Sequence, residues 1–114
     1  MNKTVMKETV AAYSEGPSRN LNFKASEAVT IDDAIKIMCK ALDCRQNDEA
    51  YNDFRPAFLK KLPKNSLVTL AREGSVCVYV HSIAFDIDEE KLRIKMGADE
   101  CDIRDGSTIR LWWD

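Results

Sequence analysis

Hydrophobic positions between residues 30 and 44 recur at the spacing of an amphipathic helix. Thr30 precedes this run and Asp33 follows three residues later, a variant of the capping box that marks helix N-termini. Apolar residues three or four positions apart lie on one face of a helix. In this run they are Ile31, Ile35, Met38 and Leu42. The pattern therefore predicts a helix over about 30–44.

A second helical stripe covers residues 48–62 and contains a proline. Its apolar members at helical spacing are Tyr51, Phe54, Phe58 and Leu62. Pro56 removes a backbone donor inside this stripe, so the helix is either kinked there or starts afresh with Asp53 as its cap. Pro63 then closes it.

The N-terminal quarter has a weaker pattern. Residues 4–15 carry apolar side chains on one side and predict a short helix, which Gly16 and Pro17 would end. Residues 21–23 read as an extended edge segment. We expect residues 1–28 to be loosely held beside a compact core at 29–114, within a single domain spanning 1–114.

After residue 64 the period changes from helical to strand-like. Four segments read as strands: 67–71, 76–80, 92–96 and 107–113. Turns are predicted at Glu73-Gly74, Asp88-Glu90 and Asp105-Gly106, a bulge near His81-Ser82, and an acidic connection over 97–105. The expected fold is α+β: a four-stranded antiparallel β-meander over residues 66–114, packed on helices at about 30–44 and 48–62.

The last strand carries both tryptophans, at adjacent positions. Successive side chains of a strand point to opposite faces, so Trp112 and Trp113 cannot both be buried in one core. If Ile109, Leu111 and Trp113 point inward, Trp112 points outward. The outward set of the sheet is then expected to hold basic and aromatic residues: Tyr79, Lys91, Arg93, Lys95, Arg110 and Trp112.

The function of such a face has three possible interpretations. Trp, Tyr and Arg are the usual anchors of protein interfaces. Basic and aromatic residues on a sheet can also stack bases and hold phosphates. The third reading is a solvated face with no partner. The sheet edge formed by the last strand would further allow self-association with a second copy.

Acidic residues gather in two predicted turns, and either group is a candidate contact with a partner. The groups are Asp86, Asp88, Glu89 and Glu90, and then Asp99, Glu100 and Asp102. The first resembles a calcium loop only in part, because Lys91 replaces the glycine and Gly97 replaces the bidentate glutamate. We expect solvated acids, with competition for a partner's basic groove as the functional alternative.

Composition adds constraints but no activity. The chain has 114 residues and a formal net charge of −2, so its overall charge favours neither nucleic acid nor an anionic membrane. Four cysteines without a secretion signal or a CxxC pair predict reduced thiols, no zinc site and a cytoplasmic location. No cofactor motif is present.

The single histidine is the only basis for an enzymatic reading. His81 would need a nucleophile or further ligands around it, and none can be read from the sequence. The sequence therefore favours a small, non-enzymatic, inhibitor- or immunity-like protein that binds another protein of unknown identity. A nucleic-acid-binding sheet and a small enzyme with a site near His81 are the alternatives.

Overall fold

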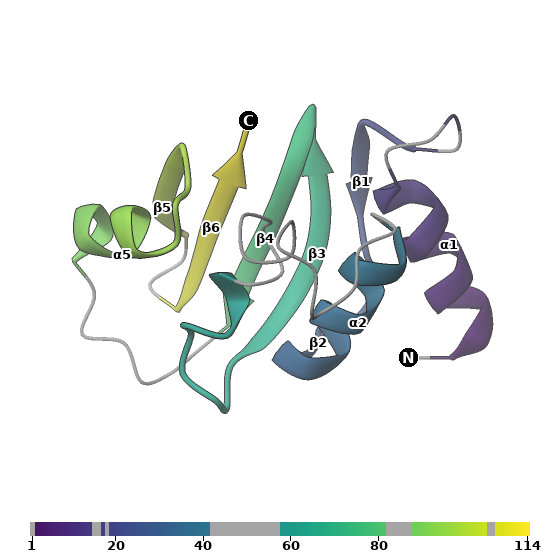
Figure 1. Ribbon diagram of the computed structural model, residues 1–114, viewed down its shortest axis with the longest axis horizontal. Coiled ribbons are helices and arrows are strands. Elements are labelled where there is room, and N and C mark those ends of the chain that lie inside the picture. Colours follow the sequence, from purple (N-terminus) through teal and green to yellow (C-terminus); the bar gives the residue numbers. More distant parts are fainter. Residues whose placement is uncertain (1, 15–16, 18, 42–57, 82–87, 105–106) are drawn as a thin grey trace.

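The computed structural model describes residues 2–14, 17, 19–41, 58–81, 88–104 and 107–114. These residues form an antiparallel sheet with helices on one side, which confirms the α+β class (Figure 1). The predicted turn at 105–106 and the bulge next to His81 fall on segments outside the described residues, as does most of the predicted helix over 48–62. Of that segment, residues 58–62 are described, and the side chains of Leu59 and Leu62 are buried in the core.

The N-terminal helix α1 spans Lys3–Tyr13, close to the predicted bounds. Its first turn is capped by Asn2, whose Oδ1 accepts a hydrogen bond from the Val5 backbone N–H at 2.8 Å. Tyr13 is fully buried in the core, and the C-terminal end of α1 is held in place there. Arg72 provides the physical reason, because its Nη2 donates to the last carbonyls of the helix, at Tyr13 (3.0 Å) and Ser14 (3.2 Å).

The helix predicted from residue 30 is confirmed as α2, which spans Ile31–Ala41. It follows directly on β2 (Val29–Thr30). The Asp33 backbone N–H donates to Thr30 Oγ1 at 3.2 Å, as the capping pattern indicated. The apolar face of α2 packs into the core, where the side chains of Ile35 and Met38 are buried.

The described residues form a sheet of six strands, where four were predicted. Strand β1 (Asn22–Lys24) confirms the extended segment near residue 22, and the predicted hairpin is formed by β3 (Leu67–Glu73) and β4 (Ser75–His81). The C-terminal part adds β5 (Glu100–Arg104) and β6 (Thr108–Trp113). The spatial order is β1-β3-β4-β6-β5, with β2 also paired to β3. The predicted strand order of a meander is therefore wrong, because the last strand, β6, lies between β4 and β5.

The strand predicted over 92–96 is a helix, α5, which spans Glu89–Lys95. Asp88 Oδ1 accepts from the backbone N–H groups of Glu90 and Lys91, at 3.1 and 3.2 Å, and so caps its first turn. Alternation over only five residues is a weak signal for a strand, and the Asp88 cap favours a helix instead. The acidic connection expected over 97–105 is wrong in the same region, since it contains β5.

Gly97 ends α5 in a conformation that suits glycine. Its φ is +59°, and the paired hydrogen bonds from Gly97 N to Ile94 O (3.1 Å) and from Ala98 N to Arg93 O (3.0 Å) form a Schellman motif. A Cβ at this position would lie 2.8 Å from Cζ of Phe58. Both the backbone angle and the close approach therefore require glycine.

Replacing Gly97 by alanine is expected to lower the free energy of unfolding by about 1–3 kcal/mol, through left-handed strain and the clash with Phe58. Gly74 is a matched control, because its φ is +76° but no atom lies within 4 Å of an added Cβ. Chemical denaturation followed by circular dichroism should show a larger loss for Gly97→Ala than for Gly74→Ala. Equal losses would mean that the contact with Phe58 is relieved without cost.

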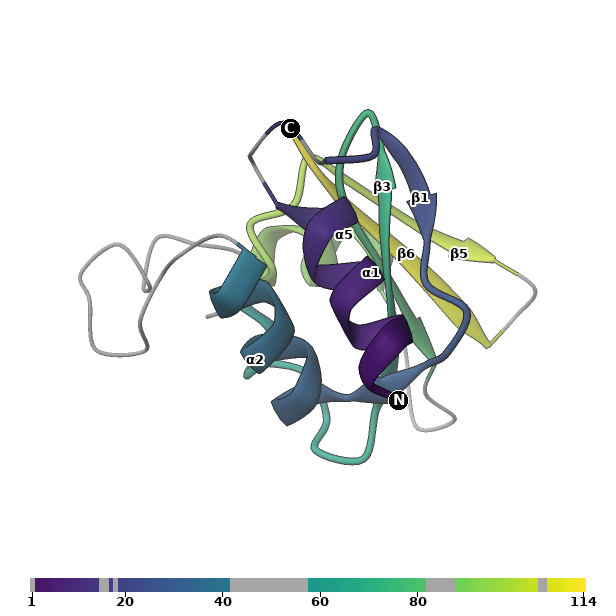
Figure 2. The same cartoon turned by 90° about the vertical axis from the view of Figure 1, so that its right-hand side faces the viewer.

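The helices and the sheet enclose one core. Figure 2 shows α1 and α2 on the same side of the sheet, and Met96, at the end of α5, is fully buried in that core as well. The strands contribute Val68, Leu70, Val76, Val78, Val80, Ile109, Leu111 and Trp113. The opposite face of the sheet is covered by no helix of the described residues.

Candidate protein-binding face

The side of the sheet away from the helices carries a group of polar and aromatic side chains, which we call the open face. Strand alternation assigns its members, because their neighbours along each strand point into the core. The open face comprises Lys24, Thr69, Glu73, Cys77, Tyr79, His81, Glu100, Asp102, Arg104, Thr108, Arg110 and Trp112. Five neighbouring strands thus supply one continuous surface.

Arg110 lies at the centre of this surface and joins three carboxylates. Its Nε donates to Glu73 Oε1 at 2.9 Å, and its Nη1 contacts Glu100 Oε1 at 3.2 Å and Asp102 Oδ1 at 3.3 Å. Only 9% of the Arg110 side chain is exposed, against 57% for Glu100. What faces solvent here is therefore mainly carboxylate, with the guanidinium beneath it.

Glu73 organises the aromatic part of the open face. One carboxylate oxygen accepts from the Tyr79 hydroxyl and from Cys77 Sγ (3.3 Å), and its backbone carbonyl accepts from Trp112 Nε1 at 2.9 Å. Lys24 Nζ lies 4.3 Å from the centre of the Tyr79 ring, in cation–π geometry. Both aromatic side chains of the open face, each of them half-buried, are thereby held in one orientation.

These contacts shift the protonation equilibria around Glu73. Although burial acts to raise it, hydrogen bonds from Tyr79, Cys77 and Arg110 hold the pKa of Glu73 below its ordinary value. Burial and the hydrogen bond to Glu73 raise the pKa of Tyr79 to about 12 and that of Cys77 to about 12. The thiol is therefore protonated near neutral pH and is a poor nucleophile.

His81 lies at the end of β4 between two threonine hydroxyls. Its Nε2 is 2.8 Å from Thr69 Oγ1, and its Nδ1 is 3.2 Å from Thr108 Oγ1. Burial, together with the positive charge of Lys24, lowers the pKa of His81. Both ring nitrogens are thus engaged with side chains of adjacent strands, and the contacts shown place no acidic partner beside the ring.

The predicted basic and aromatic face is only partly assembled. Tyr79, Arg110 and Trp112 lie on the open face as expected, although Arg110 is buried beneath carboxylates. Lys91, Arg93 and Lys95 do not join them, because they belong to α5. Arg93 instead pairs with Glu90 at 2.6 Å within that helix and donates to the carbonyl of Ala98 at 3.3 Å.

The predicted acidic contacts are divided among separate roles. Asp86 lies outside the described residues, and Asp88 caps α5. Glu89 Oε1 accepts from the Ile103 backbone N–H at 3.0 Å, and Asp99 Oδ2 accepts from the Asp114 backbone N–H at 2.8 Å. Glu100 and Asp102 are the members that belong to the open face.

Glu73 and Lys24 belong to this surface but were not predicted from the sequence. The sequence pattern places Glu73 in a turn and Lys24 within the loosely held residues 1–28. A signal for Glu73 existed, since extending the predicted strand over 67–71 by two residues keeps its parity. No pattern in the sequence links Lys24 to Tyr79, because the pairing of β1 with β3 is a tertiary event.

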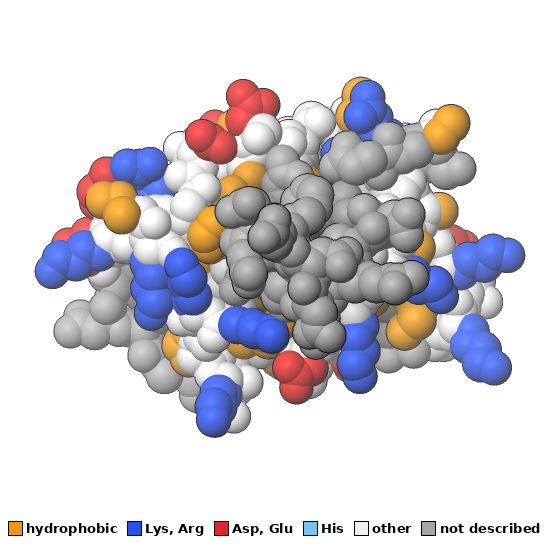
Figure 3. All heavy atoms as spheres, in the orientation of Figure 1, with side chains coloured by type: hydrophobic (Ala, Val, Ile, Leu, Met, Phe, Trp, Pro, Cys, Tyr) orange, Lys and Arg blue, Asp and Glu red, His pale blue; other side chains and the backbone are white. Residues whose placement is uncertain are grey.

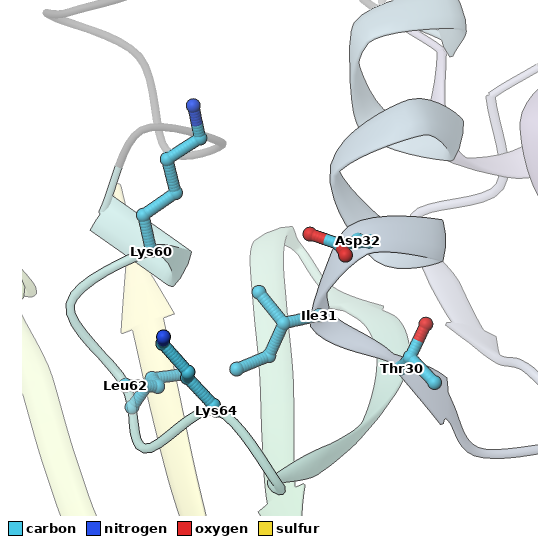
Figure 4. Close-up of a pocket in the computed structure, with 6 residues that line it drawn as sticks. All are labelled: Thr30, Ile31, Asp32, Lys60, Leu62 and Lys64. Carbon is cyan, nitrogen blue, oxygen red and sulfur yellow. The ribbon is translucent and has the colours of Figure 1, made fainter.

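Two surface depressions accompany these features. One, at the outer edge of the open face, is lined by Arg93, Glu100, Cys101, Asp102, Arg104 and Arg110. The other lies between the start of α2 and the segment after Leu59, where Lys60 and Lys64 stand opposite Asp32 (Figure 4). Figure 3 shows the helix-bearing side, with lysine and arginine side chains spread over its periphery. Within the described segments, no three His, Cys, Asp or Glu side chains are grouped so as to hold a metal ion.

Among the described residues, no helix combines the length and the apolar character needed to cross a membrane. Comparison with known proteins assigns no family: no family model matches the sequence, and neither curated proteins nor solved structures yielded a match.

Proposed function

We propose that this protein is a small, non-enzymatic binding module whose partner is another protein, contacted through the open face. The observation that carries the proposal is the shared anchoring of Tyr79, Arg110 and Trp112 by Glu73, on a sheet face without a described helix over it. Aromatic and arginine side chains are the commonest interface anchors. Since these three are already held in place, binding immobilises little additional side-chain freedom.

The charges of the open face favour a partner with basic groups. Glu100 and Asp102 keep 57% and 38% of their side chains exposed, whereas Arg110 keeps 9%. A nucleic acid would bring its phosphates against these carboxylates and be repelled. A basic protein surface would be attracted to them, as in an inhibitor or immunity protein that covers a functional groove.

The proposal also places the protein in the cytoplasm. Cys77 and Cys101 are free thiols, and burial raises the pKa of Cys101 to about 11. Cysteines left as free thiols are typical of a reducing compartment, and the raised pKa of Cys101 lowers its reactivity. His81, with both nitrogens on threonine hydroxyls, supports a structural role rather than that of a catalytic base.

Replacing Trp112 by alanine tests the proposal. Immobilised wild-type protein and the Trp112→Ala variant are incubated with extract of the source cells, and retained proteins are quantified by mass spectrometry. Met6→Ala is the matched control, because Met6 is also a partly exposed large apolar residue but lies on α1, on the other side of the sheet. We expect a partner retained by the wild type and by Met6→Ala and lost from Trp112→Ala.

The captured partner is then purified and titrated by calorimetry. Loss of a central aromatic anchor weakens binding by about 2 kcal/mol or more, roughly a thirtyfold rise in Kd. Equal affinity of wild type and Trp112→Ala would contradict the proposal. Gel-shift titration of single-stranded DNA and RNA at low salt tests the nucleic-acid alternative, for which binding that falls steeply with salt would be the signature.

A further inference from the structure

Strand β5 forms one lateral edge of the sheet, since it pairs only with β6 in the described strand order. The direction of its backbone groups follows from one contact. The Ile103 N–H donates to Glu89 Oε1 at 3.0 Å, so it points away from β6. Backbone groups alternate along an antiparallel strand, and those of Cys101 therefore point to the same outer side. Cys101 and Ile103 thus present the groups that a further strand could pair with.

The sequence of β5 is complementary to a second copy of β5 that runs in the opposite direction. In an antiparallel pair of two copies centred on Asp102, Glu100 faces Arg104 of the second copy, and the reverse pair completes the match. Cys101 likewise faces Ile103 of the second copy. Opposite charges and apolar pairs directly across two strands are the combinations that stabilise antiparallel sheets.

We propose that β5 pairs with β5 of a second copy across a two-fold axis at Asp102. In this register Cys101 and Ile103 of the second copy exchange both of their backbone hydrogen bonds, which is the pairing that the outward direction of the Ile103 N–H requires. An isologous contact of this kind closes on itself and stops at the dimer. The β1 edge of the sheet, with only three residues, offers a shorter template.

Exposed apolar side chains lie at the same edge. Ile94 on α5 is 65% exposed, and Ile103 on the edge strand β5 is 40% exposed. Pairing of the two β5 strands places Ile103 against Cys101 of the second copy, which is itself partly exposed in the single chain. The dimer therefore removes apolar surface from water in addition to forming the ladder.

Two features keep the association weak. The Glu89 carboxylate occupies the Ile103 N–H and must move aside before the second strand can bind there. Asp102 meets its own copy at the axis, although Arg104 (2.5 Å) and Arg110 (3.3 Å) offset its charge in each chain. Pairing of two five-residue strands buries less surface than the roughly 1,200 Å² of stable interfaces. We therefore expect a dissociation constant of about 0.1–1 mM for the dimer.

The dimer would extend the open face across the axis, because Glu100, Asp102 and Arg104 point to that side in both copies. A partner would then meet two copies of Tyr79 and Trp112 on one surface. The pairing itself does not depend on the proposed function, since its test needs no partner.

The register is tested by Asp102→Cys. Directly opposed residues of a non-hydrogen-bonded pair have Cα atoms about 4.5 Å apart, within the span of a disulfide. Under mild oxidation at high protein concentration, we expect Asp102→Cys to form a disulfide-linked dimer at least about ten times faster than wild type or Lys24→Cys. Lys24→Cys is the matched control, because it places a cysteine on the same face at the opposite edge. Faster linkage of Lys24→Cys than of Asp102→Cys would overturn the proposal.

The charge pairs and Glu89 are tested by sedimentation velocity over a concentration series. Glu100→Arg and Arg104→Glu, each alone, put like charges across the axis and should abolish the dimer, whereas the double variant should restore it. Glu89→Ala frees the Ile103 N–H and should strengthen association several-fold. Circular dichroism confirms that each variant is folded. Monomers at every concentration for both wild type and Glu89→Ala would overturn the proposal.

Discussion

Trp113→Ala is expected to lower the free energy of unfolding by about 3–5 kcal/mol, the usual cost of truncating a large core aromatic. Only 4% of Trp113 is exposed, and its ring packs with the core side chains of the sheet. Its Nε1 donates to the Met96 carbonyl at 3.0 Å, at the C-terminus of α5. Truncation therefore leaves a cavity and also frees a buried carbonyl where helix and sheet meet.

The neighbouring tryptophan is the internal control. Trp112 is half-buried on the open face and donates to the Glu73 backbone carbonyl at 2.9 Å. Loss of this hydrogen bond and part of the apolar contact should cost about 1–2 kcal/mol in Trp112→Ala. Urea denaturation followed by far-UV circular dichroism measures both variants without relying on tryptophan emission. Equal losses would contradict the assignment of the two rings to opposite faces.

Arg110→Met is expected to lower the free energy of unfolding by about 1–3 kcal/mol at neutral pH, less than for a fully buried ion pair because its carboxylate partners are partly exposed. Methionine keeps an apolar stem of similar length but removes the donors to Glu73, Glu100 and Asp102. The three carboxylates then repel one another without a central cation. Their repulsion, rather than a cavity, dominates the loss.

The pH dependence of this loss identifies its cause. The pKa of Glu73 is lowered in the folded protein, so its contribution to stability is present above the ordinary value of 4.5 and is lost as pH falls through the folded pKa. The difference between wild type and Arg110→Met should therefore be largest at neutral pH and shrink in acid. Denaturation curves over this range measure it.

Arg104→Met is the matched control for the arginine prediction. Its side chain is 53% exposed and pairs with Asp102 alone among the ion pairs shown, at 2.5 Å. An exposed pair of this kind contributes little to the free energy of unfolding, because solvent screens the two charges. If Arg104→Met lowers the free energy of unfolding as much as Arg110→Met does, the contacts of Arg110 with three carboxylates do not explain its effect.

The region after residue 88 shows why local patterns were insufficient. Leu92, Ile94 and Met96 alternate with basic residues and fit a strand, yet Leu92 and Met96 are also four residues apart, which is the spacing of one helix face, and Ile94 is 65% exposed. Asp88 as cap, with Glu90 in the first turn, supplied the opposing signal. Over so short a run, hydrophobic period and capping chemistry give different answers, and packing against the core selects the helix.

The open face was predictable in its aromatic positions but not in its electrostatics. Strand parity placed Tyr79 and Trp112 on the same side of the sheet, as the structure has them. Parity also placed Arg110 outward, but it could not foresee that Glu73 and the two acids of β5 would converge on its guanidinium. That convergence requires β6 to lie between β4 and β5, which no spacing in the sequence encodes.

By itself, the sequence determined the α+β class, the capped helix after Thr30, the β3–β4 hairpin and the opposite orientation of Trp112 and Trp113. Each of these follows from side-chain period and local hydrogen bonding, which act over a few neighbouring residues. Only the tertiary structure decided the strand order, the helix at 89–95 and the burial of Arg110 among carboxylates. These depend on contacts between residues far apart in the chain, whose free energy is gained only when the whole core closes.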